Sequence, residues 1–149
     1  MGRIMGLDFK IENNSKEFYS NYDEAKERMM YAIGLQWLKR VTEIITNRHK
    51  NARGGTGIVD TGRLRGSMSF STSERSEKST KKVKENKAND YINKKAEDGQ
   101  LFVGTNVEYA EYIEIGNSKM KARPFLSASL TEYKQEYKDL AEEVLKGNI

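Results

Sequence analysis

The chain has 149 residues and a formal net charge of +4, a length that suits a single domain with one modest core. It contains no cysteine, which excludes disulfides, thiolate metal sites and cysteine nucleophiles. Hydrophobic residues make up 36% and charged residues 32%, so we expect either that part of the chain is unpacked or that partners contribute to its stability.

The sequence shows no signal-peptide pattern and no apolar run of the roughly 20 residues that a membrane span requires. Together with the missing cysteines, this predicts a soluble protein made in a reducing cytoplasm. Its mild basicity suits either an ordinary lysine-rich surface or proximity to nucleic acid. We favour the former, because basic and acidic residues are mixed along most of the chain.

Residues 7–12 alternate apolar and polar side chains, which predicts a half-buried strand. From Asp23 to about Asn47 the period becomes helical, and Asn21 followed by Glu24 is typical of a helix start. One face of this helix carries an apolar stripe that we expect in the core, formed by Met29, Ala32, Ile33, Gln36, Trp37, Val41, Ile44 and Ile45.

A glycine-rich connector follows at residues 51–57, without the Gly-Lys-Ser/Thr ending of a phosphate loop. Thr61 and Gly62 are predicted to form a turn, with Asp60 hydrogen-bonding its backbone. The turn leads into a strand at residues 64–73, with three buried side chains expected at Leu64, Met68 and Phe70.

Residues 71–98 hold eight basic residues against six acidic ones and few sizeable apolar side chains. Such a stretch buries too little surface to offset its ordering entropy. We therefore treat residues 74–98 as a flexible lysine-rich insertion in a single domain spanning 1–149. Two forms are equally compatible with the sequence: a mobile loop, or a long solvated hairpin that extends the flanking strands.

Residues 101–104 form a predicted strand, the antiparallel partner of 64–73. A short helix is expected at 107–114, followed by a glycine stop at Gly116. The clearest periodicity predicts a helix at 124–146 with Pro124 in its first turn. The fold class is thus α+β: a small antiparallel sheet packed against two long helices, with a long mobile loop or hairpin extension. Helical spacing favours core packing over base stacking for Tyr109, Tyr112, Tyr133 and Tyr137.

No catalytic, cofactor-binding or metal site is predicted. The one histidine, His49, cannot supply a metal cage, and it suits a solvated helix end. Glu108, Glu111 and Glu114 recur every three residues, and we interpret them as surface or interface charges. Glu114 is the exception, because a buried ion pair could hold it, with Arg63, Arg65 or Arg123 as the partner.

Three blocks carry a family resemblance: residues 60–67, 103–116 and 122–126. Together they resemble the gene-ten-like tail-component family of long-tailed phages, small neck or tail-completion proteins that help join a DNA-filled head to a tail. With their flanking elements the blocks cover roughly residues 20 to 146. The motif residues are Asp60, Gly62, Gly104, Tyr109, Tyr112, Gly116 and Pro124.

The resemblance implies a structural virion-assembly protein of the head–tail connection, not an enzyme. Such proteins commonly form rings, often six-fold, around the DNA channel, and a closed ring requires two complementary faces on each subunit. The implied partners are other phage neck and tail proteins and further copies of the chain, in virions assembled in a bacterial cytoplasm. The sequence leaves open which neck position it fills, the ring stoichiometry, and whether an isolated subunit is monomeric.

On this reading, the candidate contact residues between subunits or partners are Arg63, Arg65, Glu114, Arg123 and Phe125, and Phe125 has core packing as its alternative role. The lysine-rich loop would contact channel DNA or an adjacent ring through Lys78, Lys81, Lys82, Lys84 and Lys87. The competing class is a small basic nucleic-acid-binding protein. That class requires basic residues on one structured face, whereas the densest run lies in the segment predicted to be least structured.

Overall fold

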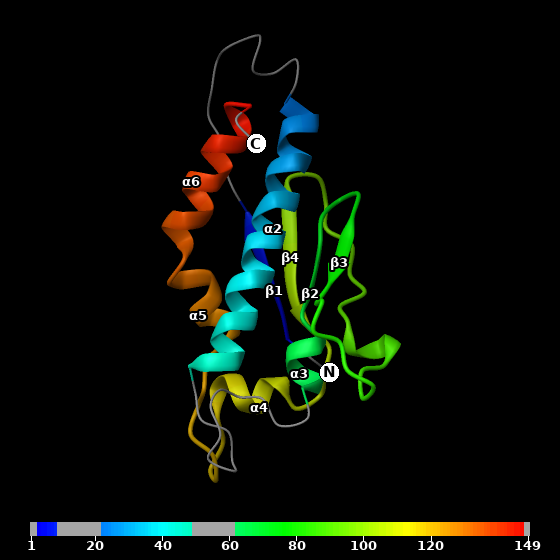
Figure 1. The fold of residues 1–149 in the computed structure, drawn as a ribbon, viewed down its shortest axis with the longest axis vertical. Coiled ribbons are helices and arrows are strands. Elements are labelled where there is room, and N and C mark those ends of the chain that lie inside the picture. The colour runs from blue at the N-terminus through cyan, green and yellow to red at the C-terminus, as the bar shows by residue number, and fades with distance from the viewer. Residues whose placement is uncertain (1–2, 9–21, 49–61, 148–149) are drawn as a thin grey trace.

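The computed structural model describes residues 3–8, 22–48 and 62–147, and it confirms the α+β class. A sheet forms one layer, and the long helix α2 packs across one of its faces with α5 and α6 beside it (Figure 1). The elements are β1 (Arg3–Asp8), α2 (Tyr22–Asn47), α3 (Arg63–Gly66), β2 (Ser69–Ser71), β3 (Ser76–Lys78), the 3-10 turn η1 (Ala88–Asp90), β4 (Gln100–Thr105), α4 (Ala110–Ile115), α5 (Leu126–Thr131) and α6 (Lys134–Leu145).

The sheet has the strand order β1-β4-β2-β3, with antiparallel pairing throughout. Ser69 of β2 lies opposite Gly104 of β4, so the predicted pairing of these two segments is confirmed. The first strand begins earlier than expected, at Arg3, where it pairs with Thr105. Of the strand predicted at residues 7–12, residues 9–12 lie outside the described residues.

The long helix predicted from Asp23 to Asn47 is confirmed in α2, whose 26 residues span about 39 Å. Its buried stripe faces the sheet and the C-terminal helices. Gly34 lies directly against the ring of Phe70, where an added Cβ would stand 2.4 Å from a ring carbon. The proposed Asn21 cap lies outside the described residues. Full burial is found at Met29, Ile33, Trp37, Val41, Ile44, Ile45 and, outside the predicted stripe, Met30.

The strand predicted at 64–73 is largely wrong, because the chain makes a helical turn before it pairs. Gly62 has φ +88°, which turns the backbone into α3. The carbonyl of Leu64 then accepts bonds from the backbone N–H of Ser67 at 3.1 Å and from its hydroxyl at 2.6 Å. Pairing is thus confined to β2. The expected burial of Leu64, Met68 and Phe70 is confirmed.

The single helix predicted at 124–146 is also wrong, because Glu132 and Tyr133 break it into α5 and α6. The Tyr137 hydroxyl donates to the carbonyl of Ser129 at 2.7 Å, and the Trp37 indole N–H donates to the Ser129 hydroxyl at 2.9 Å. These contacts satisfy polar groups at the break. Both helices still pack along α2, which explains why the apolar period continues across the break.

The helix also starts later than predicted. Pro124 lies before α5 and outside its first turn, and the helix begins at Leu126 after Phe125. The core lies between α2, the C-terminal helices and the face of the sheet that carries Phe70, Leu101 and Val103.

Of the two forms predicted for residues 71–98, the long solvated hairpin is wrong. Residues 72–75 close a short β2–β3 hairpin, and the chain then folds back over the sheet. Ser69 accepts a bond from the backbone N–H of Ile92 at 3.1 Å, and Ser71 donates to the carbonyl of Lys94 at 2.7 Å. Because Ser69 and Ser71 alternate with Phe70, this segment covers the sheet face opposite α2. Its flexibility stays a prediction.

Candidate functional site

The three blocks that carry the resemblance meet at one end of the molecule, where α3, α4 and the start of α5 lie together (Figure 1). We call this the α3–α4 end; its described residues are 62–67, 103–116 and 122–127. Ser67 and Thr105 hydroxyls bond at 2.6 Å, and both residues are fully buried. The backbone N–H of Arg123 donates to the carbonyl of Ile113 at 2.8 Å. Specific bonds therefore join blocks that are distant in sequence.

Arg63 binds two carboxylates, that of Glu108 in the second block and that of Asp90 in η1. Its Nη2 lies 2.8 Å from Asp90 Oδ1 and its Nε 3.1 Å from Oδ2, while its Nη1 lies 2.8 Å from Glu108 Oε1. The guanidinium also stands 5.7 Å from the centre of the Tyr109 ring. These contacts fold Arg63 inward onto its own chain, so most of its hydrogen-bonding capacity is used within the subunit.

Asp90 is the residue of this cluster that sequence reasoning missed. Its side chain is 3% exposed, and it also accepts bonds from Asn86 Nδ2 and from the backbone N–H of Lys87. Hydrogen bonding to Arg63 is the main cause that holds the pKa of Asp90 below its usual value, against the opposing effect of burial. The sequence signal that could have identified Asp90 is the short polar run from Asn86 to Asp90, since asparagine and aspartate side chains often hydrogen-bond nearby backbone groups.

Glu114 is buried, which the sequence left open as an alternative to a surface or interface charge, but backbone N–H groups hold it in place of an arginine. Its carboxylate accepts backbone N–H bonds from Phe125 and Leu126 on Oε2 and from Ser127 on Oε1, each at 2.9 Å. Burial opposes ionisation, yet the hydrogen bonds from these residues outweigh it and lower the pKa of Glu114. The carboxylate caps α5, where free N–H groups and the helix dipole favour a negative charge.

The remaining contact candidates divide between the core and the surface. Phe125 is fully buried, which places it in the core and not on an accessible contact surface. Arg65 bonds Thr46 through Nη1 at 3.2 Å and ties α3 to α2. Arg123 is half-buried and contacts the Met120 sulfur through Nη2. Glu114 and Phe125 are thus internal residues of the α3–α4 end.

Helix α4 is present as predicted, and Gly116 ends it with φ +74°. Its inward face carries Ala110, Ile113 and Glu114. The core position predicted for Tyr112 is wrong, because its side chain is 56% exposed, as is that of Ile115. With only six residues, α4 can present one narrow face to the core, and these two side chains fall outside it.

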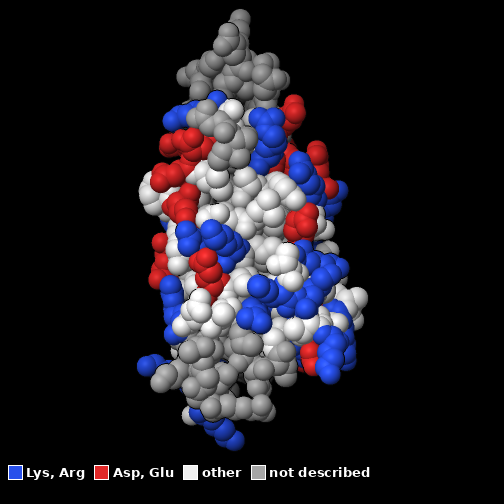
Figure 2. Space-filling view, in the orientation of Figure 1, with Lys and Arg blue, Asp and Glu red and all other residues white. Residues whose placement is uncertain are grey.

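The five candidate lysines are all exposed. They lie at the end of β3 and in the segment that follows it. Figure 2 shows basic side chains gathered along this side of the molecule. The Lys78 ammonium stands 4.6 Å from the centre of the buried Tyr91 ring. The other members are Lys81, Lys82, Lys84 and Lys87.

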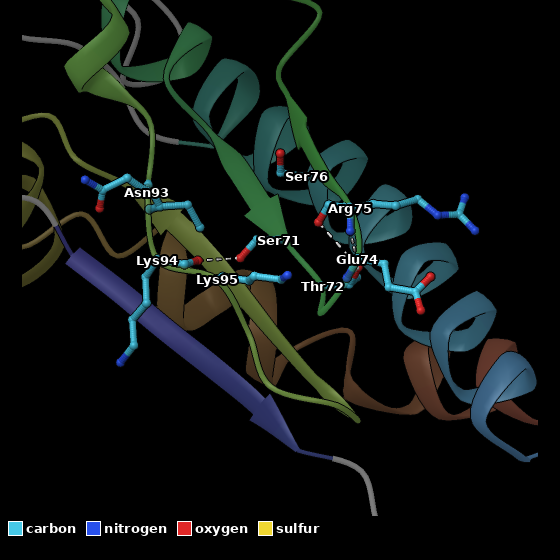
Figure 3. Close-up of a pocket in the computed structure, with 9 residues that line it drawn as sticks. Ser71, Thr72, Glu74, Arg75, Ser76, Asn93, Lys94 and Lys95 are labelled. Carbon is cyan, nitrogen blue, oxygen red and sulfur yellow. Dashed lines mark hydrogen bonds between the residues drawn. The ribbon is translucent and has the colours of Figure 1, made fainter.

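A pocket of about 250 Å³ lies between the β2–β3 hairpin and residues 92–95 (Figure 3). Figure 3 shows two of its charged side chains, Arg75 and Lys94, reaching away from it. The Arg75 guanidinium stands 4.3 Å from the Tyr31 ring centre, and the Lys94 ammonium 4.7 Å from that of Phe102. Because these two charges are engaged outside the pocket, they are not available to a ligand inside it.

Among residues 3–8, 22–48 and 62–147, no group of three or more histidine, cysteine or acidic residues could hold a metal ion. In the same part of the chain, no helix is long and apolar enough to cross a membrane. His49, Asp60 and the glycine-rich connector lie outside the described residues.

No family profile, no curated protein and no solved structure matches this chain. The resemblance stated above therefore rests on the residues of the three blocks.

Proposed function

We propose that this chain is a structural protein of the phage head–tail connection, a tail-completion or neck component that acts through protein–protein contacts. The observation that carries the proposal is the α3–α4 end, which presents Tyr112 and Ile115 to solvent. The sequence blocks that resemble the tail-component family make up this end, and specific hydrogen bonds join them. The blocks that carry the family resemblance and the two exposed side chains therefore lie in the same part of the fold.

Two features suit the exposed face of α4 for binding another protein. Exposed tyrosine is enriched at contact surfaces, and Ile115, three residues after Tyr112 on α4, adds apolar area beside it. The helix is also held at both ends, by the Arg63–Glu108 bonds before it and by Gly116 and the Arg123–Ile113 bond after it. A surface that is already fixed loses less entropy on binding, which favours affinity. In a ring, this end would supply one of the two complementary faces.

The test uses the phage or prophage that carries this gene, with the gene interrupted by a stop codon. We expect DNA-filled heads and separate tails to accumulate, seen by electron microscopy. A plasmid-borne copy of the wild-type chain should restore joined virions. A Tyr112→Ser/Ile115→Ser copy should restore at most about a tenth as many, because loss of central contact residues typically costs 2 kcal/mol or more in binding.

The matched control is Leu35→Ser, which removes another exposed large hydrophobic side chain, in the middle of α2. It should restore joining as well as the wild type. Urea unfolding of all three purified chains verifies that they are folded. Joined virions in the absence of the protein would overturn the assembly role, and full restoration by the double variant would overturn the assignment of α4.

The five exposed lysines on and after β3 favour a second candidate function, that of a small basic nucleic-acid-binding regulator. The same experiment separates the two, because a missing regulator changes the amounts of heads and tails and does not leave complete ones unjoined. Sizing by light scattering at high salt adds a second readout. A salt-resistant assembly supports the neck role, whereas a monomer or dimer that binds one duplex sequence in preference to others supports the regulator.

A further inference from the structure

The entire net charge of this protein is concentrated in one short surface segment. Residues 78–87 contain five of the 26 basic residues and one of the 22 acidic residues. Subtracting them leaves 21 of each sign elsewhere, so the remainder of the chain is formally neutral. We call residues 78–87 the lysine face.

The fold fixes the lysine face on the molecule. At its start, the backbone N–H of Ser79 bonds the carbonyl of Met68 at 2.8 Å. At its end, Asn86 Nδ2 donates to the carbonyl of Arg63 at 2.9 Å, and its Oδ1 accepts the backbone N–H of Val83 at 3.0 Å. The lysine side chains therefore project from a loop whose two ends are bonded to the α3 region.

Neighbouring carboxylates do not cancel this charge at the surface. Asp90 is turned inward onto Arg63, and Glu77 accepts the hydroxyl of Tyr31 at 2.8 Å on the α2 side. Residues 78–87 contain one acidic residue, Glu85, and five exposed lysines. Figure 2 shows the resulting gathering of basic side chains along this edge.

We propose that the lysine face binds the phosphate backbone of duplex DNA without reading its sequence. Lysine is a point charge on a flexible stem and suits phosphate contacts, whereas bidentate base recognition favours arginine, asparagine and glutamine. Closely spaced ammonium groups match the regular negative charge of a duplex, and binding is driven by the counterions that they release.

The composition of the face argues against other partners. Protein–protein contact surfaces are depleted in lysine and have an apolar centre, and the large exposed hydrophobic side chains of the described residues, Leu35, Tyr112 and Ile115, all lie elsewhere. Stable adsorption to a membrane surface typically combines basic charge with apolar side chains that insert, and the one sizeable apolar residue of the face, Val83, is half-buried. This inference makes specific the DNA contact that the resemblance implies for these lysines, but it is argued from the charge and geometry of the lysine face, and its DNA-binding test does not depend on the head–tail role.

The test is fluorescence anisotropy with two labelled duplexes of unrelated sequence, about 30 base pairs long, from about 50 to 200 mM salt. Both duplexes should bind equally. The logarithm of the affinity should fall linearly with the logarithm of salt concentration, with a slope of about −3 to −4 for four neutralised phosphates. Replacing three central lysines (Lys81→Gln/Lys82→Gln/Lys84→Gln) should reduce that slope by about 2 to 3 and lower the affinity at low salt at least tenfold.

The matched control removes the same charge from exposed positions on α6 and at its C-cap, by Lys134→Gln/Lys138→Gln/Lys146→Gln. It should leave the salt slope within about 1 of the wild-type value. Equal losses in both triple variants, an unchanged slope in the first, or tighter binding to phosphatidylserine vesicles than to DNA would each overturn the proposal. Circular dichroism verifies that both variants are folded, and their restoration of head–tail joining is scored separately from DNA binding.

Discussion

Two buried carboxylates, Glu114 and Asp90, hold the α3–α4 end together by different bonds. Each avoids the cost of burying a charge because its oxygens accept several hydrogen bonds. Glu114 is bonded to the N-terminus of α5 and carries no arginine, whereas Asp90 holds a guanidinium and a loop. The ionised form of a buried acid can therefore be stabilised either by the free N–H groups of a helix N-terminus, as at Glu114, or by a cation, as at Asp90.

Glu114→Gln tests the cap of α5. The substitution removes the charge and places an amide NH₂ group among three backbone donors, so we expect a loss of about 2 kcal/mol in the free energy of unfolding. Urea unfolding at neutral pH measures it. Glu111→Gln, an exposed change on the same helix, should stay within about 0.5 kcal/mol of the wild type.

The same variant has a predicted pH dependence. Because the folded pKa of Glu114 lies below its ordinary value of 4.5, its stabilising effect is complete above that value and is lost as pH falls through the folded pKa. The stability gap between the wild type and Glu114→Gln should therefore be widest at neutral pH and narrow on acidification. A gap that is constant from neutral to acidic pH would contradict the cap.

The contact of α2 with the sheet depends on one missing side chain. Gly34 lets the helix approach the fully buried Phe70, whose ring also packs edge-on against Tyr31 with centroids 5.8 Å apart. A glycine inside a helix normally lowers its stability. Here the close approach of helix and strand explains its presence.

Gly34→Ala should therefore destabilise the protein, although alanine has the higher helix propensity. Alanine would raise intrinsic helix stability by about 1 kcal/mol, but its Cβ would overlap the Phe70 ring, and such overpacking typically costs about 1 to 3 kcal/mol. We expect net destabilisation in urea unfolding. Combining it with Phe70→Leu should cost less than the sum of the single changes, because the smaller side chain relieves the overlap. Purely additive effects would show that the overlap is not the cause.

For the molecule as a whole, Asp90 connects the lysine-rich segment to the α3–α4 end. Asp90→Ala should lower the free energy of unfolding by about 2 to 3 kcal/mol, because it leaves a partly buried guanidinium, the Asn86 amide and the backbone N–H of Lys87 without their acceptor. Native-state hydrogen exchange should show faster exchange at Lys87, whose N–H bonds Asp90. In the same variant, the buried amides of α2 should still exchange only through global unfolding, at a rate set by the stability that remains.

Glu108→Gln is the control, since it alters the other carboxylate on the same arginine, one that is 63% exposed. It should destabilise the protein far less than Asp90→Ala, because exposed ion pairs contribute little. Equal effects of the two substitutions would show that Arg63, and not the buried Asp90, anchors the segment.

Periodicity and stop signals in the sequence determined α2, the strand β4, α4 and its end at Gly116. They did so because apolar spacing and glycine conformation are local properties. The same local rules failed at residues 64–68 and at the break before Lys134. At the first site, Gly62 and the local bonds from Ser67 to Leu64 form a helical turn that the alternation of apolar residues does not show. At the second, Ser129 is bonded by Tyr137 and by the distant Trp37, and the helix is interrupted although its apolar pattern is unbroken.

Only the tertiary structure decided which polar partners meet. The sequence marked Arg63 and Glu114 as notable, yet their partners, Asp90 and the start of α5, lie 27 and 11 or more residues away. The lysine run was visible in the sequence from the start, but its attachment to α3 through Asn86 was not. Charge content is additive and local, whereas the pairing of buried polar groups depends on how the whole chain is packed.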